Sequence, residues 1–276
     1  MQKKRILSCA LTGAATTRAQ CPHLPYTPKE LGEEAKRARD AGASIVHIHA
    51  REDNGMPSWR TEVFEEITAE VRKHCPNIII NYSTGAIGLS PKKRTAHLPV
   101  TKPEMAALNM SKKQFYFDAV FENPFSTIQQ IVETMNNADT MPEMEVFDSG
   151  HINNAMPLID MGMLKKKLCF SFVMGVLGGI PATVENLVHQ KQSIPTGAHW
   201  QVITISRKQW AMSAAAIAMG GSFRVGLEDN FYLPNGEMAK SNGELVETGV
   251  NLAHTLGAEI ASIEEAREIL GLERIS

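Results

Sequence analysis

The sequence predicts a (β/α)8 barrel, the TIM-barrel fold, and three observations favour it. Eight short apolar runs alternate with segments of helical spacing along the 276 residues. Repeated strand–helix units predict a parallel sheet, and eight units in a chain of this length fit a closed barrel better than an open sheet. No Gly-x-Gly-x-x-Gly motif follows the first strand, which counts against a dinucleotide-binding open sheet. The open doubly wound sheet is the alternative, and residues 1–276 are predicted to form one domain.

The predicted elements follow one another along the chain. Strands are expected at 5–12, 45–50, 78–85, 103–109, 144–150, 167–175, 199–205 and 222–229. Helices are expected at 28–43, 61–76, 125–138, 152–164, 181–190, 207–221, 244–257 and 262–270.

Local residue types support these boundaries. Pro28 follows Thr27 at the first position of the first helix, and Gly42 ends that helix. Pro76 ends the second helix, and the third strand is rich in β-branched residues. Thr183 lies near the start of the helix at 181–190. The stretch between the third and fifth strands has the weakest pattern.

The composition excludes several classes of protein. A net charge of −2 gives no strong attraction for nucleic acids or acidic membranes. The apolar runs are shorter than a membrane-spanning helix, and the basic N-terminal stretch lacks the apolar region and cleavage site of a signal peptide. Four cysteines, with no Cys-x-x-Cys pair among them, indicate free thiols in a reducing cytoplasm. They are Cys9, Cys21, Cys75 and Cys169.

Two histidines lie two positions apart in the run Ile45-Val46-His47-Ile48-His49-Ala50. Side chains alternate across a strand, so His47 and His49 share one face. At the carboxyl end of a barrel strand, where active sites of this fold are found, two imidazoles can bind one divalent metal ion. The alternative is a pair of hydrogen-bonded structural histidines.

Glu228 is the best candidate for a third metal ligand. It shares a face with Arg224 and Gly226 at the end of the eighth strand, which borders the first strand in a closed barrel. Two histidines and one glutamate leave coordination positions open, as in catalytic zinc sites. The alternative is a salt bridge from Glu228 to Arg51 or Arg224.

Other polar residues also lie at strand ends. The Ser83 hydroxyl can bind a carboxylate, although a turn serine beside Gly85 is the simpler interpretation. Arg224 faces inward and needs an anionic partner, which Asp229 or a substrate carboxylate can provide. Asp229 is therefore a candidate base whose position the arginine sets, and an ordinary loop carboxylate is the alternative.

A glycine-rich loop follows the sixth strand. Backbone amides at Gly178 and Gly179 can contact a phosphate or thioester. A tight turn leading into a helix explains the same glycines, and is the stronger interpretation for this motif alone.

Six motifs occur in order along nearly the whole chain: TGAATTR, LPYTPKELGEEAKRARDAGASIVHIHARED, IIINYSTG, KPEMAALN, EVFDSG and RVGLEDN. In these motifs the chain resembles the β-keto acid cleavage enzyme family, whose best-known activity is 3-keto-5-aminohexanoate cleavage. The HIHxRE and GxEDN elements are the most diagnostic.

The resemblance implies a zinc-bearing barrel, typically a homotetramer, that acts as a transferase with acetyl-CoA as co-substrate. The family reaction converts a β-keto acid and acetyl-CoA into acetoacetate and a new acyl-CoA. By resemblance, Asp229 takes or relays a proton, Arg224 holds Asp229, and Ser83 anchors the substrate carboxylate or an oxyanion. The implied zinc ligands are His47, His49 and Glu228.

Two positions depart from the aminohexanoate-cleaving pattern. Ala15 replaces a glutamate in TGAATTR, and Ala107 replaces a threonine in KPEMAALN. Alanine cannot attract a cationic group as a carboxylate does. The sequence therefore predicts the shared reaction on a β-keto acid with an uncharged or less cationic tail.

Two other functions remain open at this point. One is a zinc-dependent aldolase or hydrolase that acts without CoA, and the other is a zinc-binding oligomer without activity. Dependence of turnover on acetyl-CoA separates the first from the family reaction. The joint presence of Ser83, Arg224 and Asp229 argues against the second.

Overall fold

Eight parallel strands close into a barrel in the computed structural model, which describes residues 4–115 and 119–273. Their order around the barrel is β1-β10-β9-β8-β7-β4-β3-β2. The strands are β1 (Leu7–Ala10), β2 (Ile45–Ile48), β3 (Ile79–Tyr82), β4 (Met105–Asn109), β7 (Met141–Val146), β8 (Cys169–Met174), β9 (His199–Thr204) and β10 (Ser222–Val225). The predicted barrel is confirmed, and the open-sheet alternative is wrong.

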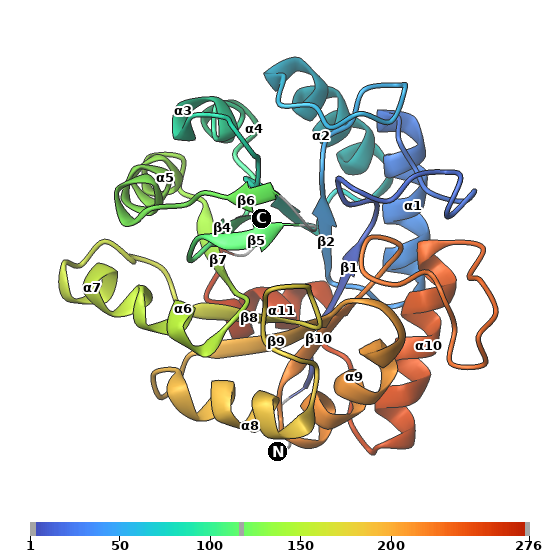
Figure 1. Cartoon of the computed structure of the whole chain (residues 1–276). Coiled ribbons are helices and arrows are strands. Elements are labelled where there is room, and N and C mark those ends of the chain that lie inside the picture. Colours follow the sequence, from blue (N-terminus) through green and yellow to red (C-terminus); the bar gives the residue numbers. More distant parts are fainter. Residues whose placement is uncertain (1–3, 116–118, 274–276) are drawn as a thin grey trace.

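Helices surround the barrel, as Figure 1 shows. They are α1 (Pro28–Ala41), α2 (Thr61–His74), α3 (Pro91–Arg94), α4 (Leu98–Thr101), α5 (Phe125–Asn137), α6 (Ser149–Asn153), α7 (Ala155–Asp160), α8 (Val184–Ser193), η1 (Ser206–Lys208), α9 (Gln209–Ala218) and α10 (Asn242–Thr255). A further helix, α11 (Ile263–Leu270), packs against one end of the barrel. The single domain predicted for 1–276 stays a prediction. That range includes residues 1–3, 116–118 and 274–276, and the basic N-terminal stretch includes residues 1–3, all of which lie outside the described residues.

The predicted start and end of the first helix have a visible physical basis. The Thr27 side chain accepts a hydrogen bond from the Glu30 amide, and the Glu30 side chain accepts one from the Thr27 amide. This reciprocal pair satisfies amides that lack partners within the helix. Gly42 ends the helix with a φ of 119°, which favours glycine over other residues. The Thr183 side chain caps α8 by accepting a hydrogen bond from the Asn186 amide.

The region between β3 and β8, the third and sixth strands of the barrel, differs from the prediction. β7 begins at Met141, not at residue 144, and Asp148 caps α6 where the strand was expected to continue. Pro142 conceals the start of β7 because proline is uncommon inside strands. The expected helix at 152–164 is replaced by the shorter α6 and α7. Two further short helices and an antiparallel hairpin were not expected: α3, α4, and β5 (Lys113–Phe115) with β6 (Ala119–Phe121).

An apolar layer fills the N-terminal end of the barrel. Ile45, Ile79 and Met105 point inward there and pack in one buried cluster with Ala266 and Leu270 of α11. Because α11 covers this end, the carboxyl ends of the strands form the open end of the barrel. Active sites of this fold are built at that end.

Two predictions about the chain as a whole can be compared with the structure. All four cysteines are buried and free of disulfide bonds, as expected. Within residues 4–115 and 119–273, no helix combines the length and the apolar character needed to cross a membrane.

His97 is buried between two aromatic rings outside the barrel. Its ring stacks on Phe64 with centroids 3.7 Å apart, and Tyr82 meets it edge-on at 5.5 Å. Neither ring nitrogen has a hydrogen-bond partner among the described residues. Burial lowers the pKa of His97 to about 3, so the folded protein holds a neutral imidazole.

Replacing His97 by leucine should flatten the pH dependence of stability. Between the ordinary pKa of 6.5 and about 3, the unfolded chain binds a proton at His97 and the folded chain does not. Stability from this residue is therefore complete above about pH 6.5 and decreases as the pH falls, by about 2 kcal/mol at pH 5. Urea unfolding at several pH values measures the effect, with the exposed His254→Leu as control. Parallel curves for wild type and His97→Leu would contradict the prediction.

Candidate metal centre and active site

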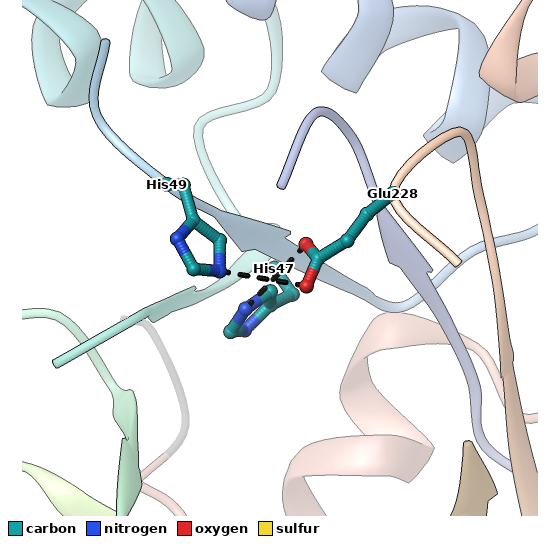
Figure 2. A group of neighbouring side chains, drawn as sticks. All are labelled: His47, His49 and Glu228. Carbon is teal, nitrogen blue, oxygen red and sulfur yellow. Dashed lines mark ion pairs between the residues drawn. The ribbon is translucent and has the colours of Figure 1, made fainter. Parts of the chain in front are cut away.

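The ends of β2 and β10 bring His47, His49 and Glu228 together at the open end of the barrel (Figure 2). The His47 Nε2 atom lies 3.7 Å from Glu228 Oε2, and the His49 Nε2 atom lies 3.4 Å from Glu228 Oε1. One potential ligand atom from each of the three residues lies within 4.8 Å of the other two. The three residues singled out in the sequence therefore converge in space.

Two glycines allow Glu228 to reach the histidines. Gly226 has a φ of 137°, and a Cβ atom there would lie 2.2 Å from the Ala10 carbonyl oxygen. Gly13 has a φ of 63°, and its Cβ would lie 2.6 Å from Glu228 Cγ. Any side chain at either position would displace the neighbouring backbone or the glutamate itself. The glycines thus allow close contact between the ends of β1 and β10.

The buried polar atoms of this cluster lack hydrogen-bond partners. His47 is 1% exposed, yet neither of its ring nitrogens has a partner among the described residues, and Glu228 Oε2 has none either. Leaving a buried polar atom unpaired costs about 1–3 kcal/mol. A divalent cation between the three side chains would satisfy these atoms, and two histidines with one glutamate are a donor set for zinc and several related metals. The residues therefore fit a metal ion.

The protonation states also suit metal binding. Burial lowers the pKa of His47 well below its ordinary value, although the Glu228 carboxylate partly opposes this, so the ring is neutral. Burial acts to raise the pKa of Glu228, but the neighbouring histidines and Arg224 outweigh it and keep the pKa low. A neutral imidazole and an ionised carboxylate are the forms that bind a metal ion.

Arg224 holds Asp229 through two hydrogen bonds inside the barrel. Its Nε atom donates to Asp229 Oδ2 at 2.8 Å, and its Nη2 atom donates to Oδ1 at 2.7 Å. The same Nη2 atom donates to Glu228 Oε1 at 3.3 Å. Arg224 thus links the candidate base to the candidate metal ligand, and one predicted alternative, a salt bridge between Glu228 and Arg224, is also present.

Arg51, the other partner considered for Glu228, binds backbone oxygens of the neighbouring loops. Its guanidinium donates to backbone oxygens of Gly13 at 2.8 Å, Thr16 at 2.8 Å and Gly55 at 2.7 Å. It therefore holds the loop after β1, which carries Gly13 against Glu228.

The surroundings of Asp229 favour the protonated, neutral carboxyl group over the carboxylate more than water does, so they raise its pKa. Burial raises its pKa to about 6, because it outweighs the attraction of Arg224 and the nearby Glu228 carboxylate adds to it. A carboxylate of this kind accepts a proton more readily than an exposed aspartate does. A general base works best when its pKa is close to the working pH.

Two glutamates that sequence reasoning missed also face this region. Glu145 Oε1 lies 3.8 Å from Arg224 Nη1, and Glu145 Oε2 accepts a hydrogen bond from Asn109 at 2.8 Å. Glu143, one layer deeper, is fully buried and accepts hydrogen bonds from Asn81, Ser171 and Gln201. The signal was two glutamates at alternate positions in the run Met141-Pro142-Glu143-Met144-Glu145-Val146. The expected strand start at residue 144 excluded the first of them.

Ser83 lies directly after β3, level with the end of β2. Its amide donates to the Ile48 carbonyl at 3.1 Å, and its hydroxyl oxygen accepts from the Gly85 amide at 3.2 Å. Ser83 is therefore a turn serine beside Gly85, as the simpler interpretation expected. Its position next to His49 at the open end of the barrel also leaves it available for a substrate, and that role stays a prediction.

The remaining predicted residues are spread over the open end. Ala15 is exposed in the loop after β1, whereas Ala107 is fully buried in β4. Gly178 has a φ of 78°, and a Cβ on Gly179 would lie 2.9 Å from the Phe147 carbonyl oxygen. Turn geometry and close packing account for these glycines, and contact with acetyl-CoA stays a prediction.

Sequence comparison decides the family. The profile of the beta-keto acid cleavage enzyme family matches residues 4–272. The chain belongs to this family. The family resemblance inferred from the six motifs is confirmed, and membership makes the chain an enzyme that cleaves β-keto acids.

Several curated relatives span the full chain. A 3-keto-5-aminohexanoate cleavage enzyme of Fusobacterium nucleatum is 42% identical, and the match covers 99% of this chain and 100% of the relative. One of Acetoanaerobium sticklandii is 43% identical with the same coverage. A 3-oxoadipate:acetyl-CoA acetyltransferase of Cupriavidus necator is 32% identical, covering 99% of this chain and 96% of the relative. Enzymes named for different β-keto acids therefore share this family.

Solved structures confirm the fold independently. The complex of ObcA with a C4-CoA adduct and oxalate is similar to this chain with a TM-score of 0.80 at 23% sequence identity. The match covers 92% of this chain and 68% of ObcA. At this identity the likeness concerns the barrel fold alone.

Replacing His49 by alanine should abolish tight metal binding and preserve the fold. The change removes one of three ligands, so the affinity loss should exceed the roughly 10–100-fold that is typical for losing an outer-sphere partner. Titration calorimetry with Zn²⁺ and metal analysis of the purified protein measure binding, and circular dichroism reports folding. The control is His254→Ala, on the exposed side of α10. Unchanged affinity would refute the site, and unfolding would indicate a structural metal.

Proposed function

We propose that this enzyme transfers the acyl group of a β-keto acid to CoA, using acetyl-CoA and producing acetoacetate. The observation that carries the proposal is the meeting of the His47–His49–Glu228 cluster with the Arg224–Asp229 pair at the open end of the barrel. Family membership supports it. So do relatives of 30–32% identity that are named acetyl-CoA-dependent transferases of 3-dehydrocarnitine, 3,5-dioxohexanoate and 3-oxoadipate.

The residues of the chain divide the work of the first step. His47, His49 and Glu228 would hold a zinc ion, which when bound supplies a Lewis acid that makes a neighbouring keto group more electron-withdrawing. Asp229 takes a proton from the carbon between the keto and carboxyl groups. Arg224 fixes both carboxylate oxygens of Asp229, so the base is already oriented before substrate binds. Ser83 donates a hydrogen bond to the substrate carboxylate.

The carbon skeleton is then exchanged in two steps. The enolate carbon forms a bond to the acetyl carbon of acetyl-CoA, and CoA leaves as its thiolate. The thiolate attacks the original keto carbon, and the bond between this carbon and the deprotonated carbon breaks. That bond cleavage leaves the rest of the substrate as a new acyl-CoA, and the carbon that was first deprotonated takes the proton back from Asp229 to give acetoacetate. Every atom of the two substrates is found in the two products.

We infer a substrate with an uncharged or less cationic tail than 3-keto-5-aminohexanoate. The aminohexanoate-cleaving pattern has a glutamate at the position of Ala15 and a threonine at the position of Ala107. Both positions of this chain lack a polar side chain, and Ala107 is fully buried in a barrel strand. A cationic amine beside the buried Ala107 would lose solvation without gaining a charged partner, and the exposed Ala15 offers no charged partner either.

We also propose that the enzyme works in the cytoplasm as a homotetramer. The free, buried cysteines suit a reducing compartment. The tetramer rests on family resemblance, and light scattering of the purified protein tests it.

A substrate screen should reveal the preference. Short aliphatic β-keto acids, tested with acetyl-CoA, should give kcat/KM values about 5–150-fold above that of 3-keto-5-aminohexanoate, since an unpaired polar contact costs about 1–3 kcal/mol. The Ala15→Glu/Ala107→Thr double variant should shift the preference toward the amino substrate. Mass spectrometry of the acyl-CoA products provides the measurement. Preference of the wild type for the amino substrate would defeat the specificity claim, and turnover without acetyl-CoA would favour an aldolase or hydrolase.

Asp229→Asn should lower kcat by about 10²–10⁴-fold, the range typical for losing a general base. The amide keeps the shape of the carboxylate but accepts no proton. Steady-state kinetics measures the effect, and Zn²⁺ titration of the same variant should show retained binding. Activity close to that of the wild type would assign the base to another residue.

A further inference from the structure

Arg94 is a buried guanidinium at the end of α3, close to the open end of the barrel. It is 1% exposed. Its Nε atom donates to the Thr84 carbonyl oxygen at 2.7 Å, and its Nη1 atom donates to Asn123 Oδ1 at 2.9 Å. The guanidinium carbon lies 5.2 Å from the centroid of the Phe121 ring. One side chain thus contacts the loop after β3 and the segment that follows the β5–β6 hairpin.

The charge of Arg94 has no carboxylate partner within residues 4–115 and 119–273. Burial alone lowers the pKa of Arg94, to about 10, so the guanidinium remains charged near neutral pH. Burying an unpaired charge is expensive, and a backbone carbonyl with an amide gives only part of the compensation. The position therefore suggests a use for the charge.

One peptide group connects Arg94 to Ser83. The Thr84 carbonyl oxygen and the Gly85 amide belong to the same peptide plane, and in a trans peptide these two groups point in opposite directions. Arg94 binds the oxygen end at 2.7 Å. The amide end donates to the Ser83 hydroxyl oxygen at 3.2 Å. By fixing the carbonyl, Arg94 fixes the direction in which the amide points.

This chain of hydrogen bonds determines how Ser83 can act. Its oxygen already accepts a hydrogen bond from Gly85, so its own hydrogen is left to donate to a ligand. A cation at the carbonyl end polarises the peptide and strengthens its N–H as a donor, which in turn strengthens the serine O–H. The hydroxyl is thereby prepared to donate to an anionic oxygen.

We propose that Arg94 is a positioning residue that fixes Ser83 as the hydrogen-bond donor to the carboxylate of the β-keto acid. The proposal rests on the role of Ser83 in the proposed function. It adds a residue that touches no substrate and acts through a single peptide group.

Further contacts keep this loop in place. Thr84 Oγ1 donates to the Ala107 carbonyl at 2.6 Å, and Asn123 Nδ2 donates to the Asn109 carbonyl. A Cβ on Gly85 would lie 3.9 Å from Phe121 Cε2, so the loop also borders the hairpin. The loop that carries Ser83 and Thr84 is therefore hydrogen-bonded to β4 through the Thr84 side chain. Its Thr84 carbonyl is hydrogen-bonded to the charged side chain of Arg94. Figure 1 shows α3 and the hairpin on this side of the barrel.

A double-mutant cycle separates positioning from structural support. The variants are Arg94→Gln, Ser83→Ala and their combination, measured by kcat and KM with the best substrate of the screen and by calorimetric binding of acetoacetate. Arg94→Gln should lower kcat/KM and acetoacetate affinity by about 10–100-fold, the value of a hydrogen bond supported by a charge. In the Ser83→Ala background the same change should cost less than about twofold. Arg94→Lys, which keeps the charge and one donor, should recover part of the loss.

The control is Arg267→Gln. Arg267 is likewise buried, but it binds Glu104 and the Asn77 carbonyl at the other end of the barrel. This variant should lower stability and leave KM and acetoacetate affinity unchanged. If Arg94→Gln does not fold, the cycle is run with Arg94→Lys.

Each outcome bears on a distinct claim. Arg94→Gln could lower kcat/KM and acetoacetate affinity equally in the wild-type and Ser83→Ala backgrounds, or not at all. Either result would overturn the inference and leave the proposed reaction standing. The protein could instead show no acetyl-CoA-dependent turnover, while Arg94→Gln still weakens acetoacetate binding only when Ser83 is present. That result would support the inference and overturn the proposed reaction. A Ser83→Ala variant with wild-type affinity and activity would overturn both the role of Ser83 and the inference.

Discussion

The positive charge of Arg224 inside the barrel is the interaction on which the rest of the site depends. A guanidinium that is 3% exposed requires anionic partners, and Asp229, Glu228 and Glu145 all lie around it. Two hydrogen bonds from Arg224 hold both carboxylate oxygens of Asp229 and so set the orientation of this carboxylate. The same arginine also binds Glu228, which places the candidate base and the candidate metal ligand on one guanidinium.

The barrel interior below this charge is layered. An apolar layer, which includes Ile45 and Ile79, closes the N-terminal end beneath α11. Above it lies a polar layer in which Glu143 is surrounded by the side chains of Ser171 and Gln201. Every second residue of a strand faces the barrel interior, so one strand contributes to successive layers. Ile79, Asn81 and Ser83, on and directly after β3, lie in this order from the apolar layer to the open end. The chemistry is therefore placed by strand geometry.

The open end is completed by loops whose shape depends on close backbone contacts. Gly226 brings the end of β10 against Ala10, and Gly13 packs against Glu228. Arg51 and Arg94 are both buried and each donates to backbone oxygens, Arg51 in the loop after β1 and Arg94 in the loop after β3. Rigid loops of this kind reduce the reorganisation needed when substrate binds, which is how binding energy becomes available for catalysis.

The sequence by itself determined the barrel, the cap at Thr27, and the shared face of His47 and His49, because these follow from local periods and capping rules. It also identified Glu228, since strand order in a closed barrel makes the last strand a near neighbour of the second. The tertiary structure alone decided that β7 begins before Pro142 and that Arg94 reaches Thr84. Those contacts join residues from separate strands and loops, and the direction of a side chain across such a gap depends on packing that no local pattern encodes.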